Sequence, residues 1–126
     1  MKKLIRIAFS CMSVLLIAAL SMNTISARTT AGKPLPADVM KIVKKSCMSC
    51  HADRGNMKAR TALNFSKWDS YSEDKQAAKA KKMCGELTKD KMPPKKYREK
   101  HPEDVPTKAE VKTICDWSAS LQPAQK

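Results

Sequence analysis

Hydrophobic residues recur at helical spacing early in the chain, after an apolar N-terminal run that is treated below. Val39, Ile42 and Val43 fall on one face of a helix, whereas their neighbours are mostly polar or charged. This pattern predicts a helix that begins at Ala37 and runs into residues 46–51.

Two further helices are predicted where capping signals precede helix-forming residues. Ser70 and Glu73 have the spacing of a capping box, and the Ala- and Lys-rich sequence after them predicts a helix to about Leu87. Thr107 and Glu110 repeat the signal before residues at helical spacing: Val111, Ile114, Cys115, Ser118 and Leu121. Because no segment shows the sustained alternation of a strand, the expected fold class is a small all-α domain of three or four helices.

Two segments between these helices are predicted to be irregular. Residues 52–62 are basic and poorly patterned, with a turn expected at Gly55. Met92 precedes Pro93 and Pro94, which lack amide donors and fix their own φ angles. Met92 is therefore expected in a stiff loop and not on a helix face.

The first 27 residues have the pattern of a secretory leader. A positive start (Lys2, Lys3, Arg6) precedes the apolar run 7–20, and small residues follow at Ser26 and Ala27. The run is about 14 residues long, short of the roughly 20 that span a bilayer, although an uncleaved N-terminal anchor is the alternative. We expect export to the periplasm and the following division: signal peptide 1–27, polar linker 28–36, folded domain 37–122 and C-terminal tail 123–126.

Composition limits the core that this domain can build. Only eleven Leu, Ile, Val or Phe residues follow position 27, which is about 11% of residues 28–126. A highly charged chain that folds by itself usually has roughly 20% or more. The formal charge is +13, of which +10 remains after loss of the leader. This excess favours acidic redox partners or anionic membrane surfaces, whereas nucleic acid is not expected for an exported chain.

One motif carries specific chemistry. Cys47-Met48-Ser49-Cys50-His51 has the form C-x-x-C-H, the attachment signature of c-type haem. Residues three apart share a helix face, so both thiols can reach one edge of a porphyrin, and His51 can act as proximal iron ligand. A covalently bound haem would also supply the apolar surface that the sequence lacks. The alternative is a Cys47–Cys50 disulfide beside an incidental histidine.

Met92 is the candidate for the second axial position. It lies in the proline-restricted loop, and a methionine thioether raises the reduction potential relative to a second histidine. His101 is the rival ligand. The other methionines are interpreted as packing residues.

Cys84 and Cys115 are expected to form a disulfide. An exported chain meets an oxidising environment, and these are the thiols that remain when haem occupies Cys47 and Cys50. The bridge would join the second and last predicted helices. A zinc site made of all four cysteines is a weaker alternative, because a structural zinc site usually has a second closely spaced pair.

The chain resembles the haem-binding domain family of small bacterial monohaem cytochromes c. The resemblance covers about residues 39–121 and rests on these residues: 46–51, Asn64-Phe65-Ser66-Lys67-Trp68, Tyr71-Ser72, Lys91-Met92-Pro93-Pro94, Tyr97, His101-Pro102, Thr107, Glu110 and Asp116-Trp117. It implies one covalent haem c wrapped by helices, with Cys47 and Cys50 as thioether sites and His51 and Met92 as axial ligands.

These observations favour a carrier of single electrons. With both axial positions filled, the iron would have no open site for a substrate. The alternative is a haem-based redox or gas sensor in which Met92 dissociates. Peroxide reduction is a weaker hypothesis, because the sequence contains one haem motif and no evident distal acid or base.

Overall fold

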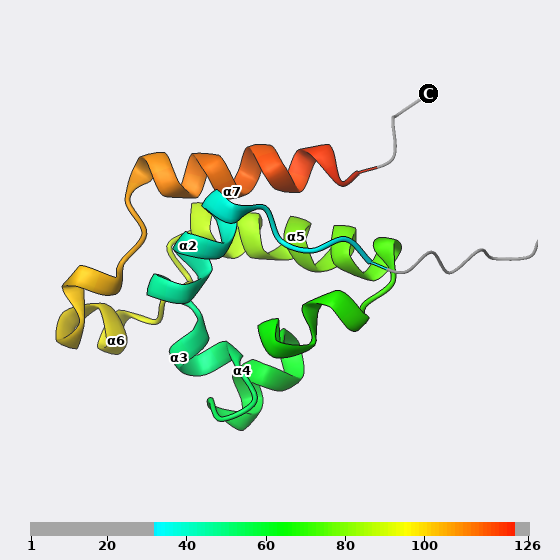
Figure 1. Cartoon of the computed structure of the whole chain (residues 1–126). Helices are drawn as coiled ribbons and strands as arrows, with labels where there is room; N and C mark the ends of the chain where they lie inside the picture. Colours follow the sequence, from blue (N-terminus) through cyan, green and yellow to red (C-terminus); the bar gives the residue numbers. More distant parts are fainter. Residues whose placement is uncertain (1–31, 123–126) are drawn as a thin grey trace, which may run out of the picture.

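Three helices form the framework of the described chain: α2 (Ala37–Ser46), α5 (Glu73–Thr88) and α7 (Lys108–Ser120). The computed structural model describes residues 32–122, so the predicted signal peptide and the tail 123–126 lie outside it. The shorter elements are α3 (Met48–His51), α4 (Met57–Ala62), α6 (Lys95–Lys100) and two 3-10 turns, η1 (Phe65–Ser70) and η2 (Pro102–Asp104). No strand occurs within 32–122, which confirms the expected all-α class (Figure 1).

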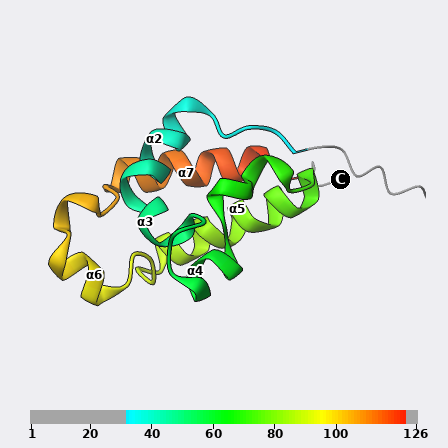
Figure 2. The same ribbon diagram turned by 60° about the horizontal axis from the view of Figure 1, so that its bottom comes forward.

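Helices α5 and α7 lie side by side in both ribbon views (Figures 1 and 2). Helix α2 packs against α7. The predicted disulfide is present and joins α5 to α7, with the Cα atoms of Cys84 and Cys115 5.0 Å apart. Because these two thiols are consumed by their own bond, the four-cysteine zinc alternative is not available to the folded chain.

The start of α7 confirms one capping prediction, and the start of α5 corrects the other. The Thr107 side chain accepts from the Glu110 amide, and the Glu110 carboxylate accepts from the Thr107 amide. At α5 the N-cap is Ser72 and not Ser70, because η1 extends to residue 70. The Ser70 hydroxyl instead donates to the Lys67 carbonyl within that turn.

The segment predicted as a loop at 52–62 also contains a helix. Asn56 caps α4, its side chain accepting from the Ala59 amide at 3.2 Å. An asparagine N-cap is a recognised start signal. It was overlooked because the six residues of α4 carry no buried apolar stripe.

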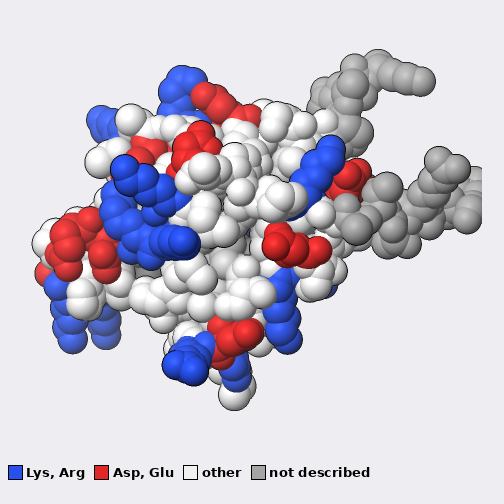
Figure 3. Space-filling model, in the orientation of Figure 1, with Lys and Arg blue, Asp and Glu red and all other residues white. Residues whose placement is uncertain are grey.

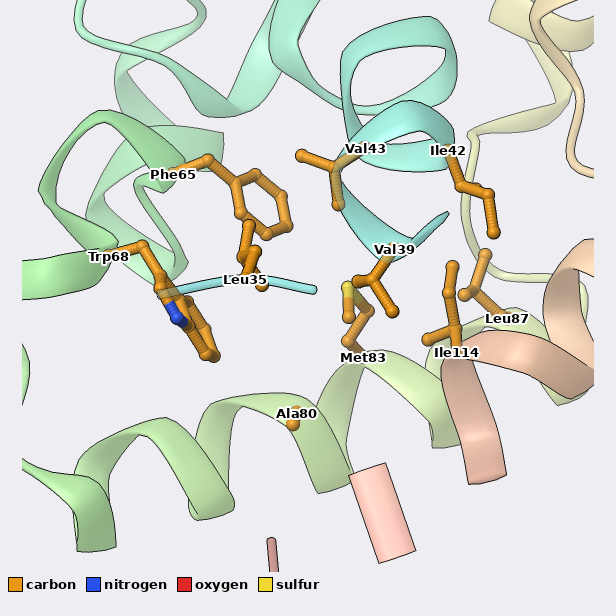
Figure 4. Close-up of a cluster of buried hydrophobic side chains, with 10 residues drawn as sticks. All are labelled: Leu35, Val39, Ile42, Val43, Phe65, Trp68, Ala80, Met83, Leu87 and Ile114. Atoms are coloured by element: carbon orange, nitrogen blue, oxygen red, sulfur yellow. The ribbon is translucent and has the colours of Figure 1, made fainter. Parts of the chain in front are cut away.

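The core is a cluster of ten buried residues contributed by α2, η1, α5, α7 and the N-terminal strap, residues 32–36 (Figure 4). Ile114 of α7 and Val39 and Val43 of α2 are fully buried. Leu35 is buried with them. The Lys33 carbonyl accepts hydrogen bonds from Trp68 Nε1 and from the side-chain amide of Gln76. Residues 32–36 are therefore part of the packed domain and not the free linker that the sequence suggested.

Within the described range, none of the helices has both the length and the apolar character needed to cross a bilayer.

Candidate functional site

All four predicted cofactor-binding residues line one cavity. The cavity has a volume of about 570 Å³ and is lined by residues of α3, α4, α5 and the segment 92–97. Cys47, Cys50 and His51 face it from the end of α2 and from α3, and Met92 faces it from the loop after α5. The size falls within the roughly 300–1,000 Å³ typical of small-molecule sites.

The two motif cysteines sit at a break in the helix. The predicted continuous helix is interrupted at Cys47, whose φ of −126° separates α2 from α3. Neither Cys47 nor Cys50 is in a disulfide. Burial, reinforced by the neighbouring Cys50, raises the pKa of the Cys47 thiol to about 12, so Cys47 is a neutral thiol at pH 7.

A glycine allows the chain to turn tightly after the motif. A Cβ atom at Gly55 would collide with the backbone carbonyl of Cys50. The turn after α3 therefore packs directly on the attachment segment, which a larger residue would push away.

The His51 ring is held in one tautomer. Its Nδ1 lies 2.9 Å from the carbonyl oxygen of Leu63. A carbonyl can only accept, so Nδ1 carries a proton and donates, and in the neutral ring the lone pair is then on Nε2. The ring of Phe65 meets His51 edge to face, with centroids 6.4 Å apart. This is the arrangement in which metal-binding histidines are usually held.

Asn64 fixes the backbone around Leu63, whose carbonyl bonds to His51. Its side-chain amide donates to the Asp53 carboxylate at 2.7 Å, and its carbonyl oxygen accepts from the Ser66 amide at 3.0 Å. Its own backbone amide donates to the Tyr71 hydroxyl at 3.2 Å. Asn64 is only 5% exposed, and its three partly buried hydrogen bonds hold the backbone next to the Leu63 carbonyl.

Met92 is the most accessible of the four predicted residues, with 38% of its surface exposed. The amides of Lys91 and Met92 both donate to the Glu86 carbonyl, at 2.9 and 3.3 Å, and this ties the loop to the end of α5. Met83 also lines the cavity but is 9% exposed and belongs to the core. The rival ligand His101 does not line the cavity and lies 3.7 Å from Glu103.

Sequence analysis missed two sets of cavity residues. The first is Tyr97, whose hydroxyl bonds to Ser49 at 3.0 Å and to Asp104 at 2.7 Å. The second is a group of lysines: Lys58, Lys79 and Lys82. The spacing of Lys79, Lys82 and Met83 on α5 could have indicated that they share a face.

The donor set suits a haem. The cavity walls are largely apolar, formed by side chains that include Leu63, Phe65, Met83, Leu87 and Pro93. A haem is a flat apolar ring that carries two carboxylates at one edge, and the three lysines offer positive charge to them. The free lone pair of His51 Nε2 and the thioether of Met92 are both suitable axial ligands for iron.

Residues 56–120 match the haem-binding domain family, which is just over half of the chain. The chain therefore belongs to the haem-binding domain family. The matched range includes Met92 and begins after His51, so the C-x-x-C-H motif lies outside it. Comparison with curated proteins and with solved structures found no match.

Proposed function

We propose that this haem-binding domain is an exported c-type cytochrome that carries single electrons on one covalently attached haem. Cys47 and Cys50 would hold the haem, and His51 and Met92 would be the axial ligands. The observation that carries the proposal is that one cavity presents two free thiols, a histidine with a free Nε2 and a methionine.

Attachment requires free thiols next to the bound ring. Each S–H would add across one vinyl C=C of the haem, sulfur to one carbon and hydrogen to the other, so that no group is released. The two cysteines are suited to this, because neither is oxidised and they lie three residues apart around the start of α3. The matured chain should therefore gain the whole mass of one haem.

Ligation decides what the site can do. The bound haem would supply an iron that accepts and releases one electron. His51 Nε2 and the Met92 thioether would both bind this iron, and a substrate would then have no free position on it. A neutral thioether stabilises the reduced iron and raises the reduction potential.

Charge and the N-terminal pattern support export and an acidic partner. The chain carries a net charge of +13, and acidic and basic groups are interspersed over the face shown in Figure 3. We expect salt-dependent association with acidic redox proteins or with an anionic membrane surface, because the excess charge steers encounters. Residues 1–27 support a periplasmic destination but lie outside the described residues.

One observation favours a second function. Met92 is 38% exposed and sits in a loop, so it could leave the iron without disturbing the core. A haem sensor in which Met92 dissociates to admit a small gas is the alternative. It differs from the carrier in one measurable property, which is binding of carbon monoxide by the reduced native protein.

Haem attachment is tested on protein matured in a host that has a c-type maturation system. Mass spectrometry should show addition of one intact haem, and a pyridine haemochrome spectrum should be of the c type. A matured chain without added haem mass, with Cys47 and Cys50 oxidised to each other, would contradict the proposal.

The distal ligand is tested by Met92→Ala. This variant should keep its covalent haem, lose the weak far-red band of the methionine–iron bond entirely and bind carbon monoxide when reduced. Met57→Ala is the matched control, because Met57 is 69% exposed and outside the cavity lining. Met83→Leu tests the other cavity methionine and should retain the band. Loss of the band in Met83→Leu, with retention in Met92→Ala, would reassign the ligand.

A further inference from the structure

We propose that Tyr97 is a positioning residue for the distal ligand. Its hydroxyl bonds to Ser49 and so ties α6, which follows the Met92 loop, to α3, which carries part of the haem-attachment motif. The inference rests on the proposed function, because it assumes that Met92 binds the iron. It adds a residue that determines how firmly Met92 is held.

The directions of the two hydrogen bonds at Tyr97 follow from their partners. The Asp104 carboxylate can only accept, so the Tyr97 hydroxyl donates its one proton to Oδ2, at 2.7 Å. The Ser49 hydroxyl then donates to the Tyr97 oxygen at 3.0 Å, which is shorter than its 4.0 Å contact with Cys50 Sγ. The pKa of Tyr97 is lowered by the Ser49 hydroxyl but raised more by Asp104 and burial, and its net shift is upward. Tyr97 therefore stays protonated and remains a donor at neutral pH.

These bonds join the two segments that carry the axial ligands. Ser49 lies between the two motif cysteines and two residues before His51, and Tyr97 lies five residues after Met92. Among the hydrogen bonds of residues 32–122, the Ser49–Tyr97 bond is the one that links the 92–97 segment to α3. The other anchors of the loop, at Glu86 and between Arg98 and Asp90, tie it to α5 and within itself.

Asp104 and His101 also orient Tyr97. Asp104 fixes the hydroxyl, and the His101 ring lies against Tyr97 with centroids 4.5 Å apart. Both come from the stretch around η2, so this stretch sets where the tyrosine points. The ring of Tyr97 itself lines the cavity. Loss of the hydroxyl would release the loop from α3 while leaving the ring in place.

Release of the loop should favour dissociation of Met92. A hydrogen bond contributes about two- to tenfold to such an equilibrium, and more where one partner is charged. We expect Tyr97→Phe to raise the equilibrium constant for Met92 dissociation about tenfold. Ser49→Ala should raise it by about threefold, because Asp104 still orients the tyrosine.

The experiment uses the oxidised holoprotein and follows the far-red methionine–iron band while pH or denaturant is raised. The midpoint for loss of the band should fall in Tyr97→Phe and in Ser49→Ala. The double variant should be no worse than Tyr97→Phe alone, because both single changes remove the same bond. Global unfolding is followed in parallel by far-ultraviolet circular dichroism, and its midpoint should move less than that of the band.

Asp104→Asn and Glu99→Gln form a matched pair. Asp104 accepts from Tyr97, whereas Glu99 is exposed on α6. The first variant should lower the pH or denaturant midpoint for loss of the band, and the second should leave this midpoint unchanged. A native protein with the band whose Tyr97→Phe variant holds Met92 equally well would overturn this inference alone. A native protein with covalent haem and no band would contradict Met92 ligation and would overturn this inference with it.

Discussion

At the scale of single residues, the chemistry of the site is set by neighbours that the motif does not contain. The C-x-x-C-H spacing identifies His51, but the Leu63 carbonyl selects its tautomer from twelve residues away. No side-chain pattern marks a backbone carbonyl as a partner, since every residue has one. The cysteines and the histidine stand out as a motif in the sequence, whereas the bond that orients the histidine does not.

Asn64 is predicted to be the residue on which this backbone depends most. Asn64→Ala removes a buried donor to Asp53 and the acceptor for the Ser66 amide. The free energy of unfolding in urea should therefore fall by about 2 kcal/mol. Asn56→Ala is the matched control. Asn56 caps α4 from an exposed position, and its loss should cost about 1 kcal/mol or less. Equal losses in the two variants would show that burial of the Asn64 bonds adds nothing.

At the scale of elements, the helix starts show where sequence signals are reliable. The capping box at Thr107 was predicted correctly because both side chains act locally. Ser70 failed as a cap because the preceding 3-10 turn competes for the same serine. The strap at 32–36 was mistaken for a linker because its anchors, Trp68 and Gln76, come from distant positions. Local signals therefore predicted the long helices, and tertiary contacts decided the rest.

The cap of α7 is also a contact between helices, and it predicts a pH-dependent stability. Lys45 of α2 lies 2.6 Å from both carboxylate oxygens of Glu110. The Lys45 bond, followed by the Thr107 amide, lowers the pKa of Glu110 below its usual 4.5. Because the native pKa is depressed, the stabilisation is complete above pH 4.5 and disappears as pH falls through the native value.

Glu110→Gln should therefore unfold more easily than the native chain at pH 7, by about 1 kcal/mol, and by less at pH 3. The measurement is chemical denaturation of both proteins at the two pH values. Glu99→Gln is the control, since Glu99 is exposed on α6 and should show no pH-dependent difference. A Glu110→Gln deficit of the same size at both pH values would contradict the role of the carboxylate charge.

At the scale of the whole molecule, a small core stands beside a large apolar cavity. The ten clustered residues are six Leu, Ile or Val residues, two aromatic residues, a methionine and an alanine. The shortage of aliphatic residues predicted this correctly. Helical spacing indicates that Lys79, Lys82 and Met83 share a face of α5, but not what that face meets, because a lysine on a helix surface looks the same whether it faces a cofactor or water.

The balance between core and cavity predicts that the chain without haem is poorly stable. A Cys47→Ala/Cys50→Ala variant, which cannot attach haem, should lose several kcal/mol, because burial of a haem stabilises by about 25 cal/mol per Å². Its thermal midpoint by circular dichroism should fall by on the order of 20 °C. The Cys84–Cys115 bridge is kept in both proteins, so it does not enter the difference. Coincident melting curves would show that the helices need no cofactor.

The pairing of Cys84 with Cys115 has a consequence for biogenesis. Under the proposed attachment, Cys47 and Cys50 must be reduced when the haem arrives, whereas Cys84 and Cys115 of the same polypeptide form a disulfide in the folded chain. Cys47 and Cys50 are close enough in sequence to be oxidised first, which would block attachment. Under the proposed export and attachment, maturation therefore requires a thiol reductant that acts at residues 47 and 50 and spares the bridge between α5 and α7.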